Sequence, residues 1–302
     1  MKVVRNNFVK KILALSLGLT FIAAPFAALA RTKGATNATT TASKAGVQTV
    51  RGIENAGALR AFYTALSDIR EGRRTEPIRI AHYGDSHTAA NILTAEVRRN
   101  FERDFGGGVD AARQARSRVI YDVLGINGAR AVRLMSWNDS SFASSVVRRK
   151  PDLIILAYGT NEVTDNNWSV ESYQRLFVNI MRRFRRAAPQ ASILIFGPPD
   201  RAVRGAGGWQ SVSKMTALLE AQRRAAIEMG AAFWSSYAAM GGAGSMNTWV
   251  AKGMGQPDHV HLTARGYIRL GDMFYDDFLS AYEAYVPTDN RRQDDLRRAL
   301  QF

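Results

Sequence analysis

The sequence contains no cysteine among its 302 residues. That absence excludes a disulfide framework, a zinc site built on thiolates and a cysteine nucleophile. Proline (8 residues) and histidine (4 residues) are also scarce. Lys and Arg outnumber Asp and Glu by 41 to 26, giving a net charge of +15, and 46% of the residues are hydrophobic. This composition excludes collagen-like, coiled-coil and wholly disordered chains, and the length suits one large domain or two smaller ones.

The longest apolar run lies at the N-terminus. Residues 1–11 contain four Lys or Arg and no acidic residue, and the apolar run over residues 12–30 ends in Ala-Leu-Ala. This order predicts a secretory signal peptide, residues 1–30, cleaved before Arg31. The alternative is an uncleaved anchor, because the run is nearly long enough to span a bilayer. Cleavage would leave a charge of 15 − 4 = +11 on an exported protein, periplasmic or extracellular. Export argues against nucleic acid as a partner and favours anionic envelope polymers or lipid headgroups.

The remaining sequence divides into a linker, a domain and a tail. Residues 31–50, rich in Thr, Ala, Gly and Ser, predict a flexible linker. Over residues 51–285, short β-rich runs alternate with helical patterns. We expect strands at 78–83, 118–124, 153–158, 192–196 and 232–234, and helices at 89–105, 171–186, 212–229 and 264–282. The alternation predicts a three-layer α/β domain with a mainly parallel, five-stranded sheet. Residues 286–302, with few apolar side chains, are expected to form a C-terminal tail.

Polar residues gather in four loops that this sheet would bring to one edge. Residues 84–87 follow the first strand, 125–129 the second and 159–162 the third, while 258–263 precede the last helix. Ligands of such sheets bind at the carboxyl ends of the strands. All four histidines lie in or beside these loops: His82 and His87 flank Ser86, and His259 and His261 lie in the last loop. We therefore expect the functional site at this edge.

Ser86, Asp258 and His261 suit nucleophilic catalysis. A serine hydroxyl is a weak nucleophile and needs a neighbouring base. The three-residue spacing of Asp258 and His261 lets the carboxylate hold one imidazole nitrogen while the other nitrogen faces a hydroxyl. Taken singly, Ser86 is equally explained as a helix N-cap and Asp258 as a turn cap.

An attacked carbonyl gathers negative charge, which requires hydrogen-bond donors aimed at it in advance. Removing one such donor typically costs about 2.7–4 kcal/mol of transition-state stabilisation. The candidate donors are the backbone N–H groups of Ser86 and Gly128 and the side-chain amide of Asn161. Gly128 alone is equally a turn residue, and Asn161 alone a loop cap. The combination favours an oxyanion hole.

The four loops resemble the sequence blocks of the SGNH (GDSL-type) hydrolase family, which is named for its Ser, Gly, Asn and His. The matching residues are 84–86 in block one, Gly128 in block two, 159–161 in block three and 258–261 in block five. Gly125 competes with Gly128 for block two. The similarity spans about residues 78 to 275.

This resemblance implies a flavodoxin-like sheet and ester hydrolysis. It also implies Ser86, Gly128, Asn161 and His261 as the functional set, with Asp258 completing a triad. Ser86, Gly128 and Asn161 would form the oxyanion hole. The mechanism requires no metal and no organic cofactor.

A narrower resemblance, over residues 82–89, 125–129 and 258–263, is to periplasmic peptidoglycan O-acetylesterases of this superfamily. Those enzymes often carry a β-rich carbohydrate-binding module between the first two blocks, whereas about forty residues separate Ser86 from Gly128 here. The resemblance implies an exported serine esterase that removes O-acetyl or other short acyl groups from an envelope glycan such as peptidoglycan. The alternatives are a lipid-ester or thioester hydrolase or an acyltransferase on the same triad, and a non-catalytic envelope-binding protein.

Further residues near these loops allow two interpretations each. The glycine-rich segment 241–255 is either a flap whose Trp249 and Met254 line the substrate site, or an irregular connection with Trp249 packed inward. His87 is expected to support the site from behind. His259 and His261 have a spacing that also suits a metal-ligating pair, although the serine arrangement already explains His261.

Overall fold

The computed structural model of the chain describes residues 52–106 and 118–299. The expected signal peptide, residues 1–30, and the expected linker, residues 31–50, lie outside the described residues. No helix in the described ranges is long and apolar enough to cross a membrane.

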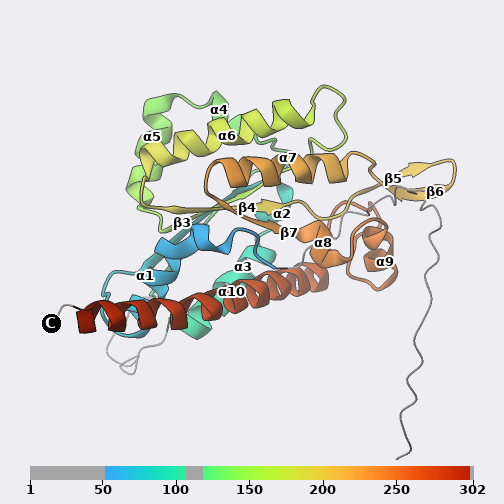
Figure 1. The fold of residues 1–302 in the computed structure, drawn as a ribbon. Coiled ribbons are helices and arrows are strands. Elements are labelled where there is room, and N and C mark those ends of the chain that lie inside the picture. The colour runs from blue at the N-terminus through green and yellow to red at the C-terminus, as the bar shows by residue number, and fades with distance from the viewer. Residues whose placement is uncertain (1–51, 107–117, 300–302) are drawn as a thin grey trace, which may run out of the picture. The chain divides into compact units, whose positions relative to one another are not determined.

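Five parallel strands form the sheet, in the order β2-β1-β3-β4-β7 (Figure 1). They are β1 (Ile78–Gly84), β2 (Val119–Gly125), β3 (Leu153–Ala157), β4 (Ser192–Gly197) and β7 (Ala232–Ser235). Strand side chains alternate between the two faces, and the central strand β3 is apolar on both. Leu153 and Ile155 belong to one buried cluster, while Ile154 and Leu156 belong to the other. The five-stranded parallel α/β fold expected from the sequence is confirmed.

Helices cover both faces of the sheet. One face carries α1 (Arg60–Arg70), α3 (Leu93–Phe105) and α10 (Ala264–Ala299), and the other carries α5 (Asp139–Arg149), α6 (Val170–Ala187) and α7 (Met215–Glu228). An apolar stripe at helical spacing explains why each helix packs on the sheet. In α6 this stripe is buried and consists of Tyr173, Phe177, Ile180, Met181 and Phe184.

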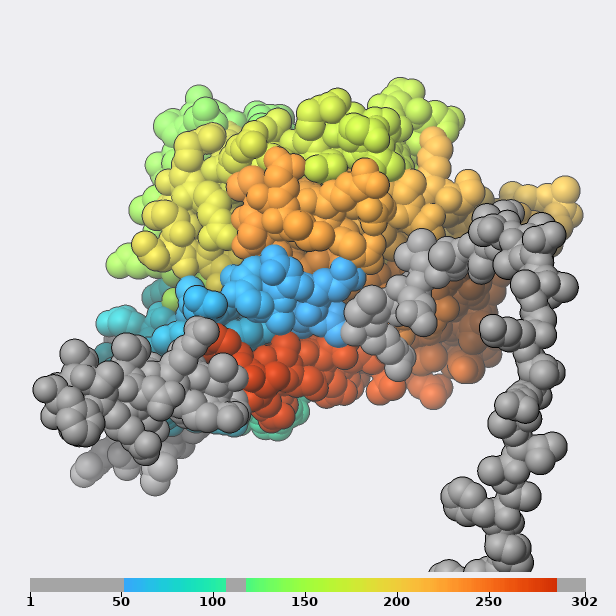
Figure 2. Space-filling model, viewed as in Figure 1, coloured from blue at the N-terminus to red at the C-terminus, as the bar shows by residue number. Residues whose placement is uncertain are grey.

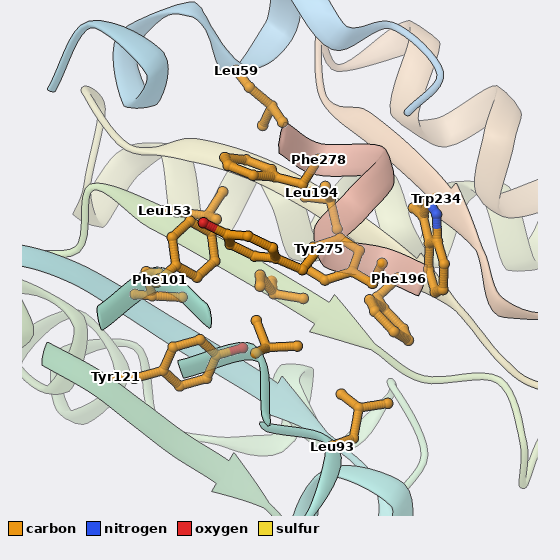
Figure 3. Close-up of a cluster of buried hydrophobic side chains, with 14 of the residues drawn as sticks. Leu59, Leu93, Phe101, Tyr121, Leu153, Leu194, Phe196, Trp234, Tyr275 and Phe278 are labelled. Carbon is orange, nitrogen blue, oxygen red and sulfur yellow. The ribbon is translucent and has the colours of Figure 1, made fainter. Parts of the chain in front are cut away.

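Aromatic rings hold α10 against the sheet and against α3 (Figure 3). The Phe101 ring of α3 meets the rings of Tyr275 and Phe278 of α10 at centroid distances of 5.1 and 5.0 Å, both edge-on. The Phe274 ring of α10 lies 5.1 Å from that of Phe196 of β4 and 5.2 Å from that of Trp234 of β7, centre to centre. Such offset and edge-on contacts are favourable beyond the apolar area that they bury. They fix the position of α10 and therefore of the loop before it, residues 258–263.

The segment before α1 covers the β7 edge of the sheet. Glu54 N–H donates to the Phe233 carbonyl at 2.9 Å, and Phe233 N–H donates to the Glu54 carbonyl at 3.0 Å. A short helix, η1 (Ala56–Leu59), leads into α1, and this segment lies between α7 and α10 in Figure 2. The pairing removes an exposed strand edge, a common site of unwanted association.

Helix boundaries differ from expectation at two places. The helix expected from residue 89 is divided into α2 (Ser86–Ala89) and α3, because Asn91 adopts a left-handed conformation with φ of 54°. Near the C-terminus, α10 continues to Ala299, so residues 286–299, which were expected to form a tail, extend this helix.

Several elements were not expected. They are α5, the shorter helices α4 (Arg133–Ser136), α8 (Ser236–Met240) and α9 (Ser245–Ala251), and the antiparallel hairpin of β5 (Ala202–Gly205) and β6 (Gly208–Ser211). The hairpin and α9 pack beside the 258–263 loop: Ala202 N–H donates to the His259 carbonyl at 3.0 Å, and Asn247 lies within hydrogen-bond distance of the His259 ring.

Candidate active site

The register of β1, β2 and β3 aligns the carboxyl ends of these strands, so the three loops that follow them begin next to one another. Gly84 at the end of β1 lies beside Gly125 of β2 and Ala157 of β3. A side chain at Gly84 would approach Thr88 Oγ1 to 2.0 Å, and one at Gly125 would approach Ala89 N to 2.2 Å. Only glycine therefore lets α2 pack directly over these strand ends.

Ser86 is the first residue of α2. The preceding Asp85 caps the helix, and its Oδ1 accepts a hydrogen bond from His87 N–H at 3.0 Å. This cap fixes the turn from strand to helix that places the Ser86 hydroxyl at the sheet edge.

Ser86, His261 and Asp258 form one hydrogen-bonded chain. Ser86 Oγ lies 3.0 Å from His261 Nε2, and His261 Nδ1 lies 2.7 Å from Asp258 Oδ2. Because a carboxylate only accepts hydrogen bonds, Nδ1 carries the proton and Nε2 is free to accept the serine proton. The structure thus brings together the three residues that the sequence singled out.

Asp258 is held by its own loop. Its Oδ1 accepts hydrogen bonds from the backbone N–H groups of Val260 and His261, at 2.9 and 3.0 Å. Partial burial alone would raise the pKa of Asp258, but the hydrogen bonds from the His261 ring and from these N–H groups outweigh it and hold that pKa below its usual value. Asp258 is therefore ionised near neutral pH and accepts a hydrogen bond from the His261 ring.

His259 anchors the same loop from the other side. Its backbone is left-handed, with φ of 55°, and its ring stacks on Trp209 of β6 at a centroid distance of 4.0 Å. Its Nδ1 lies 2.9 Å from Asn247 Oδ1 of α9. The contacts of His259 with Trp209 and Asn247 could not be expected from the sequence, because the hairpin and α9 are short and lie in glycine-rich segments.

No metal-binding group is formed by the pair that the sequence suggested. The His259 ring is hydrogen-bonded to Asn247, whereas the His261 ring is hydrogen-bonded to Ser86 and Asp258. Among residues 52–106 and 118–299, no three His, Asp or Glu side chains come close enough together to hold a metal ion.

A cavity of about 560 Å³ opens beside the triad. Ser86 and His261 line it together with amide-bearing and small residues, among them Ala89, Ala90, Asn127, Gly128, Asn161 and Gln256. Tyr267 of α10 and Leu262 complete one wall. The cavity has room for a bulky alcohol at the nucleophile and offers polar groups to its hydroxyls.

The three residues expected to form an oxyanion hole, Ser86, Gly128 and Asn161, all line this cavity. The backbone N–H groups of Ser86 and Gly128 have no acceptor within the described part of the chain. Gly128 lines the cavity with φ of 70°, whereas Gly125 is packed against Ala89. Asn161 Nδ2 donates one hydrogen to the Ala129 carbonyl at 2.9 Å, which orients the amide and leaves its second hydrogen for a ligand. This geometry favours Gly128 over Gly125 as the oxyanion glycine.

The two residues expected to line the substrate site, Trp249 and Met254, lie elsewhere. Trp249 belongs to α9, is only 5% exposed within the core, and its Nε1 donates to the Met240 carbonyl at 3.2 Å. Met254 packs against the same cluster, and neither residue lines the cavity. The flap interpretation was wrong, because α9 turns its apolar side inward and buries the indole ring.

Three buried titratable residues, His82, Asp85 and His87, lie close to Ser86 in the chain. Burial raises the pKa of the Asp85 carboxyl to about 7, against the lowering effect of the His87 N–H. Burial lowers the pKa of His87 to about 3, and its ring lies 5.4 Å from that of His261 while its Nδ1 is hydrogen-bonded to Tyr267. Burial likewise lowers the pKa of His82 to about 3. His87 therefore supports the catalytic ring as a neutral group.

These shifts predict an acid-sensitive fold. Between pH 6.5 and 4, His82 and His87 bind protons only when unfolded, so each reduces the free energy of unfolding as the pH falls. Asp85 has the opposite effect, because over this window it is protonated when folded and ionised when unfolded. Among these three groups the two histidines outweigh the aspartate, and together we expect them to lower the free energy of unfolding by about 3 kcal/mol over this window, measured by urea unfolding.

Asp85→Asn isolates the aspartate's share, since asparagine still accepts the His87 hydrogen bond. The variant should match the wild type near pH 4 and exceed its stability by about 4 kcal/mol at pH 8. Asp165→Asn, at an exposed ion pair, serves as control. Identical pH profiles of Asp85→Asn and wild type would contradict the assignment.

Comparisons with known proteins agree with this geometry. The GDSL-like Lipase/Acylhydrolase family model matches residues 82–269, while no curated protein matches the sequence. A solved peptidoglycan O-acetylesterase is 20% identical, with 77% of this chain and 99% of that chain covered and a TM-score of 0.68. A two-domain esterase active on acetylated mannans is 14% identical, with 78% and 56% covered and a TM-score of 0.55. At these identities the structural likenesses show the shared fold.

Proposed function

The chain belongs to the GDSL-like lipase/acylhydrolase family of ester-hydrolysing enzymes, and from that premise we propose that it is an exported serine esterase. Its substrate would be an envelope glycan such as peptidoglycan, from which it removes O-acetyl or other short acyl groups. The main support is the hydrogen-bonded chain from Asp258 through His261 to Ser86 beside the 560 Å³ cavity.

In the first half of the reaction, Ser86 Oγ attacks the ester carbonyl and His261 Nε2 takes the hydroxyl proton. Asp258 holds the ring in the required tautomer and stabilises the imidazolium. The carbonyl oxygen becomes an oxyanion that accepts hydrogen bonds from Ser86 N–H, Gly128 N–H and the Asn161 amide. His261 then protonates the departing sugar alcohol, and the acyl group stays on Ser86.

In the second half, water enters the place of the sugar alcohol. His261, neutral again, takes a proton from the water, which attacks the acyl carbon. The same three donors stabilise the second oxyanion. Collapse releases the carboxylic acid and returns the proton to Ser86.

Three observations favour an acylated glycan as the substrate. The basic N-terminus and apolar run of residues 1–30 are typical of export, where envelope glycans lie. The amides of Asn127, Asn161 and Gln256 line the cavity and suit sugar hydroxyls. A peptidoglycan O-acetylesterase and an esterase active on acetylated mannans share the fold.

A substrate comparison tests the proposal. The purified protein should release acetate from O-acetylated peptidoglycan faster than from acetylated xylan, and release none from peptidoglycan stripped of acetyl groups by base. It should also prefer p-nitrophenyl acetate to the octanoate by about tenfold or more in kcat/KM. A preference for octanoate or for lipid esters would contradict the deacetylase assignment, and binding to the glycan without acetate release would indicate the non-catalytic alternative.

A further inference from the structure

A second cavity, of about 240 Å³, lies next to the first one at the carboxyl ends of β1 and β2. Gly125 and Ile126 line the second cavity, while the next two residues, Asn127 and Gly128, line the catalytic one. Consecutive Cα atoms are about 3.8 Å apart, so one stretch of backbone separates the two cavities. The two cavities are therefore neighbours at this edge of the sheet.

The chain segment that supplies Ile126 and Trp137 to this cavity is unusually rich in exposed apolar residues. Of eight large hydrophobic residues that are exposed in the described ranges, four lie in the single segment 126–137. They are Ile126 (39% exposed), Val132 (54%), Met135 (39%) and Trp137 (36%). Exposed apolar residues are ordinary when scattered, whereas a cluster beside a cavity marks a binding site.

The same cavity offers one cation without a carboxylate partner. Arg133 lines it, is exposed and forms no ion pair within the described residues. Its neighbours differ, because Arg130 is paired with Asp165 and Arg149 with Asp122. A guanidinium in this position suits a carboxylate, which it binds through two parallel hydrogen bonds.

A buried arginine holds one wall of the second cavity in place through hydrogen bonds to its backbone. Arg183 of α6 is 4% exposed and donates hydrogen bonds to the carbonyls of Leu134 and Trp137. Its guanidinium also lies 2.7 Å from Asp139 Oδ1 and 4.3 Å from the centre of the Phe142 ring. These contacts hold α4 and Trp137 in place before any ligand binds, which reduces the entropy lost on binding.

We propose that this second cavity binds a carboxylate-bearing portion of the glycan polymer, beside the sugar residue whose ester lies at Ser86. Trp137, the exposed aromatic residue of the cavity, would pack against the apolar side of this portion, and Arg133 would pair with its carboxylate. The inference rests on the proposed function and narrows its substrate class to acidic glycans. An extended acyl chain is less suited, because the 125–128 backbone separates the cavity from Ser86.

The test compares Arg133→Gln and Trp137→Ala in the full-length protein. Both should lower kcat/KM for O-acetylated peptidoglycan by about tenfold to a hundredfold, chiefly through KM. Both should leave p-nitrophenyl acetate hydrolysis unchanged, and Arg133→Gln should leave neutral acetylated xylan unchanged. Arg175→Gln and Ile227→Ala, at exposed positions of α6 and α7 that line neither cavity, are the matched controls.

Three outcomes would overturn the subsite. In the first, Arg133→Gln hydrolyses peptidoglycan as the wild type does. In the second, the small ester is lost in parallel, which means that the segment acts only on the catalytic loop. In the third, the variants lose binding to anionic lipid vesicles while glycan hydrolysis persists, which identifies a membrane-docking surface. If the wild type hydrolyses no ester, the proposed function fails separately. The subsite is then tested by equilibrium dialysis of deacetylated glycan fragments, which Arg133→Gln should bind less tightly.

Discussion

Replacing Ser86 with alanine is expected to lower kcat/KM for p-nitrophenyl acetate by a factor of about 10⁴ to 10⁶. The substitution removes the only hydroxyl within hydrogen-bond distance of His261 Nε2 among the described residues. The oxyanion donors and the cavity remain, so a small residual rate above the uncatalysed reaction should persist. Steady-state kinetics with active-site titration would measure the loss.

The fold should tolerate this change. The Ser86 hydroxyl makes one hydrogen bond, to His261, and alanine is favourable at the first position of a helix. Ser280→Ala is a matched control, since that hydroxyl donates only to the Asp276 carbonyl of its own helix. A Ser86→Ala protein with the thermal stability and also the rate of the wild type would refute the serine mechanism.

The sheet could be predicted because its strands are short, apolar and followed by turn residues. The run 153–156 is apolar on both faces, as expected of a central strand, and the structure buries all four side chains. In a parallel sheet the loops that follow the strands share one edge. The sequence alone therefore places Ser86 and Asn161 at the same edge.

Residues whose role depends on tertiary neighbours could not be predicted in the same way. Gly125 and Gly128 are indistinguishable in sequence, but one meets Ala89 of α2 and the other faces the cavity. Trp249 belongs to a seven-residue helix whose flanking glycines do not suggest a helix in the sequence. Only the packing of α9 determines that the Trp249 ring is buried. The sequence gives no signal for Arg133, because its lack of a carboxylate partner among the described residues is a property of the folded surface.

Hairpin β5–β6 illustrates the same limit for whole elements. Its strands are four residues each, and glycines at 205, 207 and 208 weaken any alternating pattern. Yet Trp209 of this hairpin stacks on His259 and so supports the loop of the catalytic base. Local sequence pattern pointed to Ser86, Asp258 and His261, whereas long-range packing determines which residues hold their loops in place.

Asp258→Asn should lower kcat by about 10³ to 10⁴ while leaving KM for a small ester nearly unchanged. Asparagine Oδ1 can still accept the N–H groups of Val260 and His261, so the loop keeps its shape. Its amide nitrogen would then face His261 Nδ1, and that nitrogen would have to accept a hydrogen bond. The proton would move to Nε2, where it faces Ser86 Oγ and prevents the ring from acting as the base.

Asp165→Asn is the control for this substitution, because it removes the same charge from an exposed carboxylate paired with Arg130, on the loop that follows β3. Its kcat should stay within about threefold of the wild type, since an exposed ion pair contributes little. If Asp258→Asn retains more than about a tenth of wild-type kcat, the carboxylate does not set the tautomer. Ser86 and His261 would then act as a dyad, and the short 2.7 Å contact to Asp258 would serve only to shape the loop.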